Sequence, residues 1–166
     1  MILPPQCGQN YRSKTYATEV LVDIGRLFEI ANLAALVGWT MLALSPLRRT
    51  LLIKGARIVG VALALTYTVL LGSAVVTLGE TGEGLDFSSL EGVTRAFARP
   101  EGVLVGWVHY LAFDLWIGAW AAEDAAKRGV PHWALLPCLV FTLLAGPFGL
   151  LLYLAIRRTP IARPNA

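Results

Sequence analysis

The sequence predicts an all-α integral membrane protein, a four-helix bundle with a short interfacial helix between its second and third spans. Composition favours this fold class, because 56% of the 166 residues are hydrophobic and only 15% are charged, whereas soluble domains carry about 25% charged residues. The pattern agrees, since four apolar runs are each long enough to cross about 30 Å of hydrocarbon as a helix. A chain of this length forms a single transmembrane domain over residues 1–166.

The first span is predicted over about residues 20–44, after an irregular tail that covers residues 1 to about 18 and contains two early prolines. The apolar run ends at Ser45-Pro46, a helix stop signal. Within this span Glu29 and Asn32 share one helix face. A basic connector is predicted to follow, with Arg48, Arg49, Lys54 and Arg57.

The second span is predicted over about residues 58–78 and contains no charged residue. Small residues recur in it every four positions, a pattern that lets membrane helices approach closely. Tyr67 lies beside this stripe and could donate a hydrogen bond into the bundle. The stripe consists of Gly60, Ala64, Thr68 and Gly72.

A short interfacial helix is predicted from about residue 89 to 98, after an acidic and glycine-rich loop. Ser88 and Glu91 have the spacing of a capping box, which indicates a helix start. Pro100 and Glu101 then open the third span, predicted over about residues 102–122.

The fourth span is predicted over about residues 133–156, with a kink or local unwinding at Gly146-Pro147-Phe148-Gly149. Four spans place the basic first connector and the basic C-terminal tail on opposite sides, so the positive-inside rule favours neither orientation. The acidic second loop favours termini outside the cytoplasm.

The third span carries two ionisable residues, His109 and Asp114, in an otherwise apolar stretch. Such groups are costly inside a membrane and indicate a functional site by default. At about 100° per residue they lie about 140° apart, and together they could flank a cavity that also contains Tyr110. Glu29, Asn32 and Tyr67 lie at depths where they could meet them.

A packing role is the alternative for these polar residues, since each hydrogen bond between membrane helices contributes about 0.6 to 2 kcal/mol. It is the preferred interpretation for Asn32 and Tyr67 taken alone. Trp116, like the other tryptophans of the second half, is either an interfacial aromatic or part of a flat aromatic pocket for a polyene.

Several other classes of protein are disfavoured by the residues. The chain has two histidines and two distant cysteines, and no Glu-x-x-His repeat, so no metal site is predicted; a single histidine–carboxylate site is the alternative that the residues leave open. No phosphate-binding loop or dinucleotide fingerprint is present, and no cofactor is predicted. The basic residues lie at the ends of apolar runs, which disfavours nucleic acid as a partner.

Two stretches of the second half, GWVHYLAFDLWIGAW (106–120) and TLLAGPFGLLLYL (142–154), resemble the abscisic-acid-deficient-four-like family. The segment Arg128-Gly-Val-Pro-His132 belongs to the same resemblance, and the first span matches mainly at Phe28-Glu29-Ile-Ala-Asn32. These are small four-span membrane proteins with a plant plastid member required for neoxanthin synthesis. Ala119 is a departure, because many members carry an arginine there.

The resemblance implies an intramembrane carotenoid-modifying protein, an acid/base isomerase acting on the end group of a carotenoid or related isoprenoid. Conversion of the epoxide end of violaxanthin into the allenic end of neoxanthin needs one acid and one base. His109 and Asp114 are the predicted catalytic pair, with Glu29 third. The predicted substrate-binding residues are Asn32, Tyr67, Tyr110 and Trp116.

A non-catalytic role is the alternative hypothesis, in which the chain binds carotenoid or lipid as an accessory subunit of a pigment-bearing membrane complex. A small proton-coupled carrier is less favoured, because the two halves show no inverted repeat. Expected partners are a carotenoid or isoprenoid, membrane lipids, and a second copy or a larger membrane complex. The expected location is a bacterial inner membrane or a plastid-type membrane.

Overall fold

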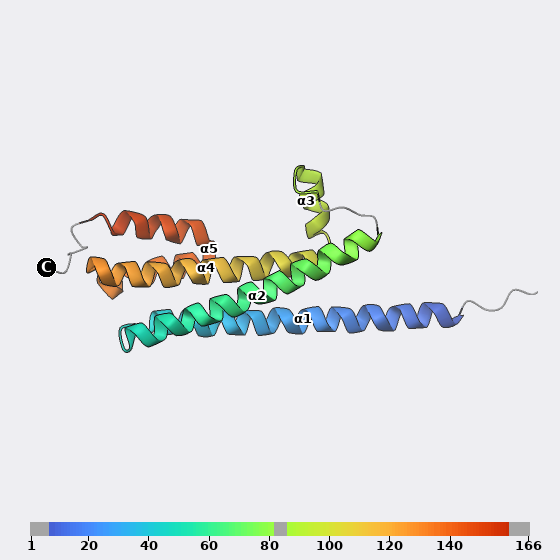
Figure 1. The fold of residues 1–166 in the computed structure, drawn as a ribbon, viewed down its shortest axis with the longest axis horizontal. Coiled ribbons are helices and arrows are strands. Elements are labelled where there is room, and N and C mark those ends of the chain that lie inside the picture. Colours follow the sequence, from blue (N-terminus) through green and yellow to red (C-terminus); the bar gives the residue numbers. More distant parts are fainter. Residues whose placement is uncertain (1–6, 82–85, 160–166) are drawn as a thin grey trace, which may run out of the picture.

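The computed structural model describes residues 7–81 and 86–159, and the side chains of residues 23–77 and 86–159. All the elements in these ranges are helices (Figure 1). Four of the five are long and apolar enough to cross a membrane, which confirms the predicted fold class. In chain order they are α1 (Cys7–Ala43), α2 (Arg49–Thr81), α3 (Leu90–Phe97), α4 (Pro100–Arg128) and α5 (His132–Ile156).

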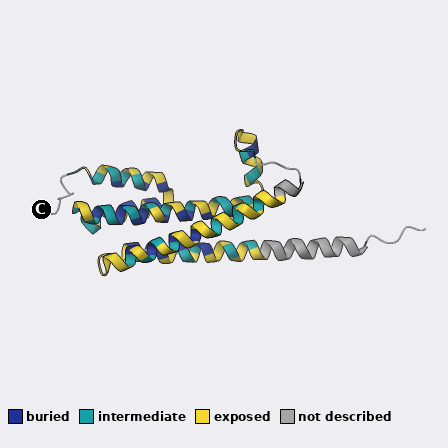
Figure 2. Ribbon diagram, viewed as in Figure 1, coloured by how far each residue is buried: buried dark blue, intermediate teal, exposed yellow. Residues whose placement is uncertain are grey.

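Helix α4 is the central element of the bundle, and it contacts each of the other four helices. It is also the most buried of the membrane-length helices, and dark blue segments recur along it in Figure 2. Pro100 occupies its first turn, and Gly129 ends it in the left-handed conformation with φ of 67°. The start predicted at Pro100 is therefore confirmed.

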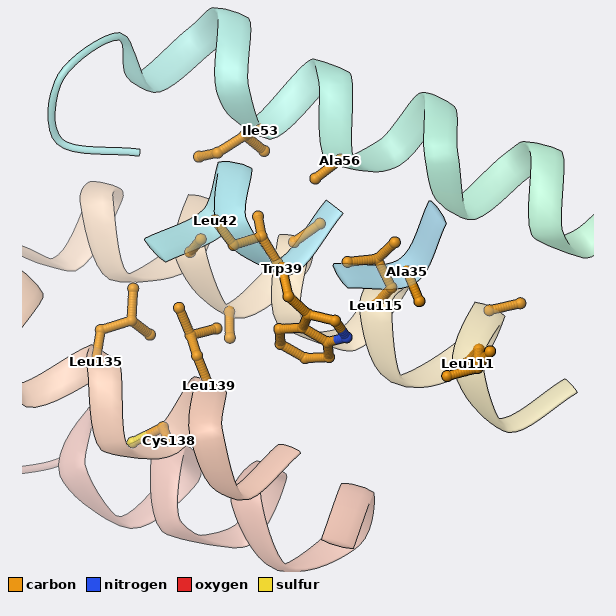
Figure 3. Close-up of a cluster of buried hydrophobic side chains, with 14 of the residues drawn as sticks. Ala35, Trp39, Leu42, Ile53, Ala56, Leu111, Leu115, Leu135, Cys138 and Leu139 are labelled. Atoms are coloured by element: carbon orange, nitrogen blue, oxygen red, sulfur yellow. The ribbon is translucent and has the colours of Figure 1, made fainter. Parts of the chain in front are cut away.

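The core contains Trp39 and Leu42 of α1 together with buried apolar side chains from α2, α4 and α5 (Figure 3). The indole ring packs directly on Gly118 of α4, where an added methyl group would overlap it. Leu42 and Leu115 beside it are fully buried. Glycine and alanine on α4 thus let a large ring of α1 enter the bundle, which brings these two helices close together.

The face of α2 that meets the bundle differs from the predicted stripe. Of the stripe, only Gly60 is buried, whereas Ala64, Thr68 and Gly72 are exposed. A step of four residues turns a helix by about 400°, so the stripe drifts by about 40° at each step. The buried face instead alternates steps of three and four residues and consists of Ile53, Ala56, Gly60 and Leu63.

Two predicted boundaries near the start of the chain are wrong. Helix α1 begins at Cys7, so most of the predicted irregular tail is helical; both early prolines precede this point and do not interrupt the helix. Helix α2 begins at Arg49, so Lys54 and Arg57 lie on a helix and the connector is short. The first two spans are therefore parts of longer helices.

The short helix α3 was predicted within one residue at each end. Its N-cap is Ser89, whose hydroxyl accepts a hydrogen bond from the amide of Gly92 at 3.0 Å. The cap is one residue later than the predicted Ser88, because the Asp86 carboxylate accepts hydrogen bonds from both the amide and the hydroxyl of Ser88. Ser88 thereby belongs to the turn before the helix.

Helix α5 is folded back on itself at Ala145, the non-helical residue inside it. Its two arms, residues 132–144 and 146–156, pack so closely that a Cβ at Gly149 would overlap the backbone of Thr142. His132 at its start lies 2.8 Å from the carbonyl of Ala43, and Arg157 just after its end lies 3.2 Å from Asp124. The predicted kink is confirmed, and it is sharp enough to bring both ends of α5 to one end of the bundle (Figure 1).

Candidate functional site

Asp114 lies in the middle of α4 and faces the fold of α5. Its carboxyl group lies against Gly146, where the Cβ of any other residue would overlap it. The Oδ2 atom is buried and has no hydrogen-bond partner among the described residues. A buried polar atom without a partner is uncommon and costly. The Trp39 indole nitrogen is a second such atom among the described residues, so Oδ2 of Asp114 is the one that belongs to an ionisable group.

Tyr110 lies one helical turn before Asp114 and connects α4 to the same fold. Its hydroxyl donates a hydrogen bond to the carbonyl of Leu143 at 2.6 Å. Pro147 has no N–H, so this carbonyl lacks the donor that a regular helix would supply four residues later. Tyr110 supplies that donor and also interacts with the Asp114 carboxyl. We call Tyr110, Asp114, Leu143 and Gly146 the tip cluster.

The predicted catalytic partner His109 lies on a different side of α4. It is exposed, and its ring centroid lies 5.1 Å from that of Tyr67 on α2 and 4.7 Å from that of Phe113. Asp114, by contrast, faces α5. The structure therefore does not bring His109 and Asp114 together, and Tyr67 accompanies His109 rather than the tip cluster.

The remaining predicted site residues lie away from the tip cluster. Glu29 is exposed on α1. Asn32 accepts a hydrogen bond from the Trp107 indole at 3.0 Å and donates one to the carbonyl of Phe28 at 2.7 Å, as expected of a packing residue. Trp116 is 46% exposed, and the Arg57 guanidinium lies 5.8 Å from its ring centroid. Only Asp114 and Tyr110 of the predicted set belong to the tip cluster.

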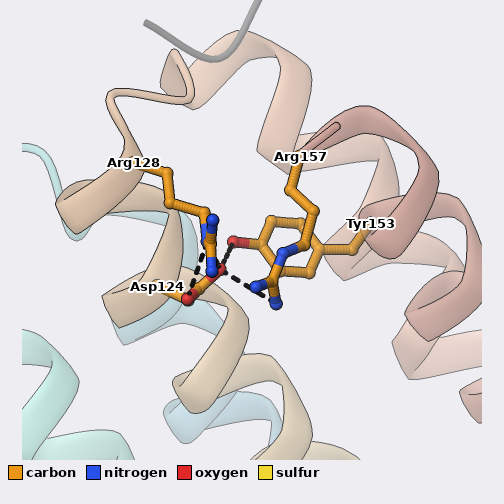
Figure 4. A network of polar contacts seen from close by, with 4 residues as sticks. All are labelled: Asp124, Arg128, Tyr153 and Arg157. Atoms are coloured by element: carbon orange, nitrogen blue, oxygen red, sulfur yellow. Dashed lines mark hydrogen bonds and ion pairs between the residues drawn. The ribbon is translucent and has the colours of Figure 1, made fainter. Parts of the chain in front are cut away.

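A second polar cluster, centred on Asp124, was not identified from the sequence (Figure 4). The carboxylate accepts hydrogen bonds from the Tyr153 hydroxyl at 2.6 Å and from the Arg128 guanidinium at 2.9 Å, and it forms an ion pair with Arg157 at 3.2 Å. In the sequence Asp124 lies near the end of the third span, a position typical of a solvated helix end. Tyr153 and Arg157, one turn apart after a Gly-Pro break, were the available signal.

An apolar groove of about 500 Å³ opens between α1 and the junction of α3 with α4. Most of its wall is aliphatic or aromatic, so it would accept part of an apolar chain. Among the described residues, no three histidine, cysteine, aspartate or glutamate side chains gather where they could hold a metal ion. The groove is lined by Ile24, Gly25, Phe28, Ala98, Arg99, Pro100, Val103 and Leu104.

The comparison with protein families identifies the class of protein. A family described as ABA DEFICIENT 4-like matches residues 26–153, which include the whole tip cluster. The chain belongs to this family. Its members are linked to neoxanthin and carotenoid-related function. No curated protein and no solved structure matches the chain.

Proposed function

We propose that this protein modifies the end group of a carotenoid or related isoprenoid inside the membrane, as an acid/base isomerase centred on Asp114. The observation that supports this proposal is the buried Oδ2 atom of Asp114, which has no partner among the described residues. A carboxyl oxygen that lies in an apolar segment and makes no hydrogen bond is available for proton transfer. Membership of a carotenoid-linked family supports the substrate class.

In the proposed reaction, Asp114 donates a proton to the oxygen of an epoxide as a carbon–oxygen bond breaks. The substrate then loses a proton from a vinylic carbon, which gives an allenic alcohol of unchanged mass and oxidation state. The Asp114 carboxylate formed in the first step accepts that proton and is restored. Tyr110, which is anchored to the Leu143 carbonyl, positions this carboxyl beside the fold of α5.

A non-catalytic pigment-binding role is the second candidate, and the exposure of α2 favours it. Only 11% of the most apolar stretch of α2 is buried inside the bundle. The rest of that stretch is a large apolar surface for a pigment, a second copy of the chain or a larger complex. The open groove beside α1 suits the same role. In this case the protein would carry pigment without converting it.

Expression in bacteria that accumulate different carotenoids tests both candidates. We expect a new pigment of unchanged mass with the native protein and none with Asp114→Asn. Glu101→Gln is the matched control, because it makes the same change at an exposed carboxyl on the same helix. Co-purification of an unchanged carotenoid would favour the binding role, and equal product from native protein and Asp114→Asn would reject Asp114 as the catalytic group.

A further inference from the structure

The two ends of the bundle differ in charge. At the end where α1 meets α2, basic side chains far outnumber the carboxylates Glu123 and Asp124. At the opposite end, near α3, the described carboxylates Asp23, Glu29, Asp86, Glu91 and Glu101 outnumber the described cations. The basic side chains of the first end are Arg48, Arg49, Lys54, Arg57, Lys127, Arg128, Arg157 and Arg158.

This segregation depends on the fold of α5. A straight helix would carry Arg157 and Arg158 to the acidic end, whereas the folded helix returns them to Asp124. Each arm of α5 is about 20 Å long or less, too short to cross about 30 Å of hydrocarbon. The tip of the fold lies beside Asp114 in the middle of α4. Both arms therefore fit a segment that enters the membrane part of the way and turns back.

We infer that α5 enters and leaves the membrane on one face, and that this face, shared with the α1–α2 connector, binds the headgroups of an anionic lipid leaflet. The basic clusters that favoured opposite orientations in a four-span reading now favour the same one, with this face in the cytoplasm. The N-terminal end of α1 then lies on the other side. This inference does not depend on the proposed substrate.

Basic side chains without an ion-pair partner indicate that anionic lipid headgroups bind to this face. Arg57, Lys127, Arg128 and Arg157 are engaged by Glu123 or Asp124. The side chains of a second set are exposed and form no ion pair or hydrogen bond with the described residues, so they are free to contact lipid phosphates. Each such cation near an anionic surface contributes on the order of 1 kcal/mol to binding. This free set consists of Arg48, Arg49, Lys54 and Arg158.

Cysteine labelling tests the topology in the full-length chain. Three variants are made separately in a Cys7→Ser background: Leu47→Cys, Thr159→Cys and Leu90→Cys. Cys138 is buried, so the Cys7→Ser protein without an added cysteine gives the background labelling. With a membrane-impermeant thiol reagent, we expect the first two to label in inside-out vesicles and the third in right-side-out vesicles. Labelling of Thr159→Cys together with Leu90→Cys would overturn the folded-back topology. Labelling of both Leu47→Cys and Thr159→Cys from outside would overturn the assigned leaflet.

Lipid selectivity tests the binding surface. Purified protein is equilibrated with phosphatidylglycerol and phosphatidylcholine, and the lipids it retains are measured by native mass spectrometry. We expect Arg48→Gln/Arg49→Gln/Lys54→Gln to lower the preference for phosphatidylglycerol on the order of tenfold or more. The control Arg26→Gln/Arg95→Gln, at the acidic end, should keep it. An unchanged preference in the triple variant, or an equal loss in the control, would overturn the inference.

Discussion

Asp114 and Asp124 lie on the same helix and both meet the second arm of α5, yet their surroundings differ. Asp124 is held by Tyr153, Arg128 and Arg157, whereas Oδ2 of Asp114 has no partner among the described residues. Asp124 therefore anchors the end of α5 to α4. Asp114 packs against Gly146 at the tip of the fold but forms no ion pair with the described residues. The two carboxylates therefore differ in how fully the fold satisfies them, and under the proposed function only Asp114 transfers a proton.

The largest expected effect lies in the rate of product formation. We expect Asp114→Asn to lower it by about 100-fold or more, the usual range for loss of a general acid. His109→Ala should lower it by less than about tenfold, because the imidazole faces α2 and not the tip cluster. Product yield per folded protein, measured in a carotenoid-accumulating host, distinguishes them. An equal collapse in both variants would restore the predicted His109–Asp114 pair.

Asp124→Asn should lower the stability of the protein and leave product formation per folded protein largely unchanged. It removes ion pairs to two arginines, one of which, Arg157, is mostly buried, and it weakens the Tyr153 hydrogen bond. We expect the free energy of unfolding to fall by about 1–3 kcal/mol. Thermal unfolding in detergent measures this, with Glu101→Gln as control. A large loss of product from fully folded Asp124→Asn would contradict the division of roles between the two carboxylates.

The positions of the spans could be predicted from sequence, because length and apolar content define a membrane helix. The faces of α1 and α2 could not. Lipid-facing residues are as apolar as core residues, so Leu36 and Ile58 are exposed on helices whose buried faces use alanine and glycine. Glu29 was placed in the site for this reason, although α1 presents Ala31, Ala35 and Trp39 to the bundle.

Only the α4 part of the candidate site could be predicted from the sequence. Asp114 was found because an acidic residue in an apolar span is unusual. Its neighbour Gly146 could not be identified as part of the site. The Gly-Pro break indicates a kink but leaves the direction of the following arm open. That direction is set by contacts distant in sequence, such as Gly149 against Thr142 and Arg157 against Asp124.

Tyr110→Phe tests whether the tip cluster holds the fold of α5 in place. The change leaves the Leu143 carbonyl without its donor, and we expect the free energy of unfolding to fall by about 1 kcal/mol. Tyr67→Phe is the matched control on the α2 side, where the ring makes an aromatic contact with His109. Thermal unfolding compares the two. Equal stability of both variants would show that the Tyr110 hydroxyl does not support the fold.

The smallest expected effect concerns Asp86, a carboxylate that lies outside the four membrane-length helices and accepts several hydrogen bonds. Hydrogen bonds from Ser88 and Ser89 hold its pKa at about 2, below the ordinary value of about 3.9. Because folding lowers this pKa, the stabilisation of the α3 cap is present above about pH 4 and is lost as the pH falls towards 2. Amide exchange at Gly92 should follow that change, and Asp86→Asn should abolish it. An Asp86 side chain that titrates near pH 4 by NMR would contradict the prediction. Asp86 could then no longer serve as the hydrogen-bonded carboxylate with which Asp114 is compared.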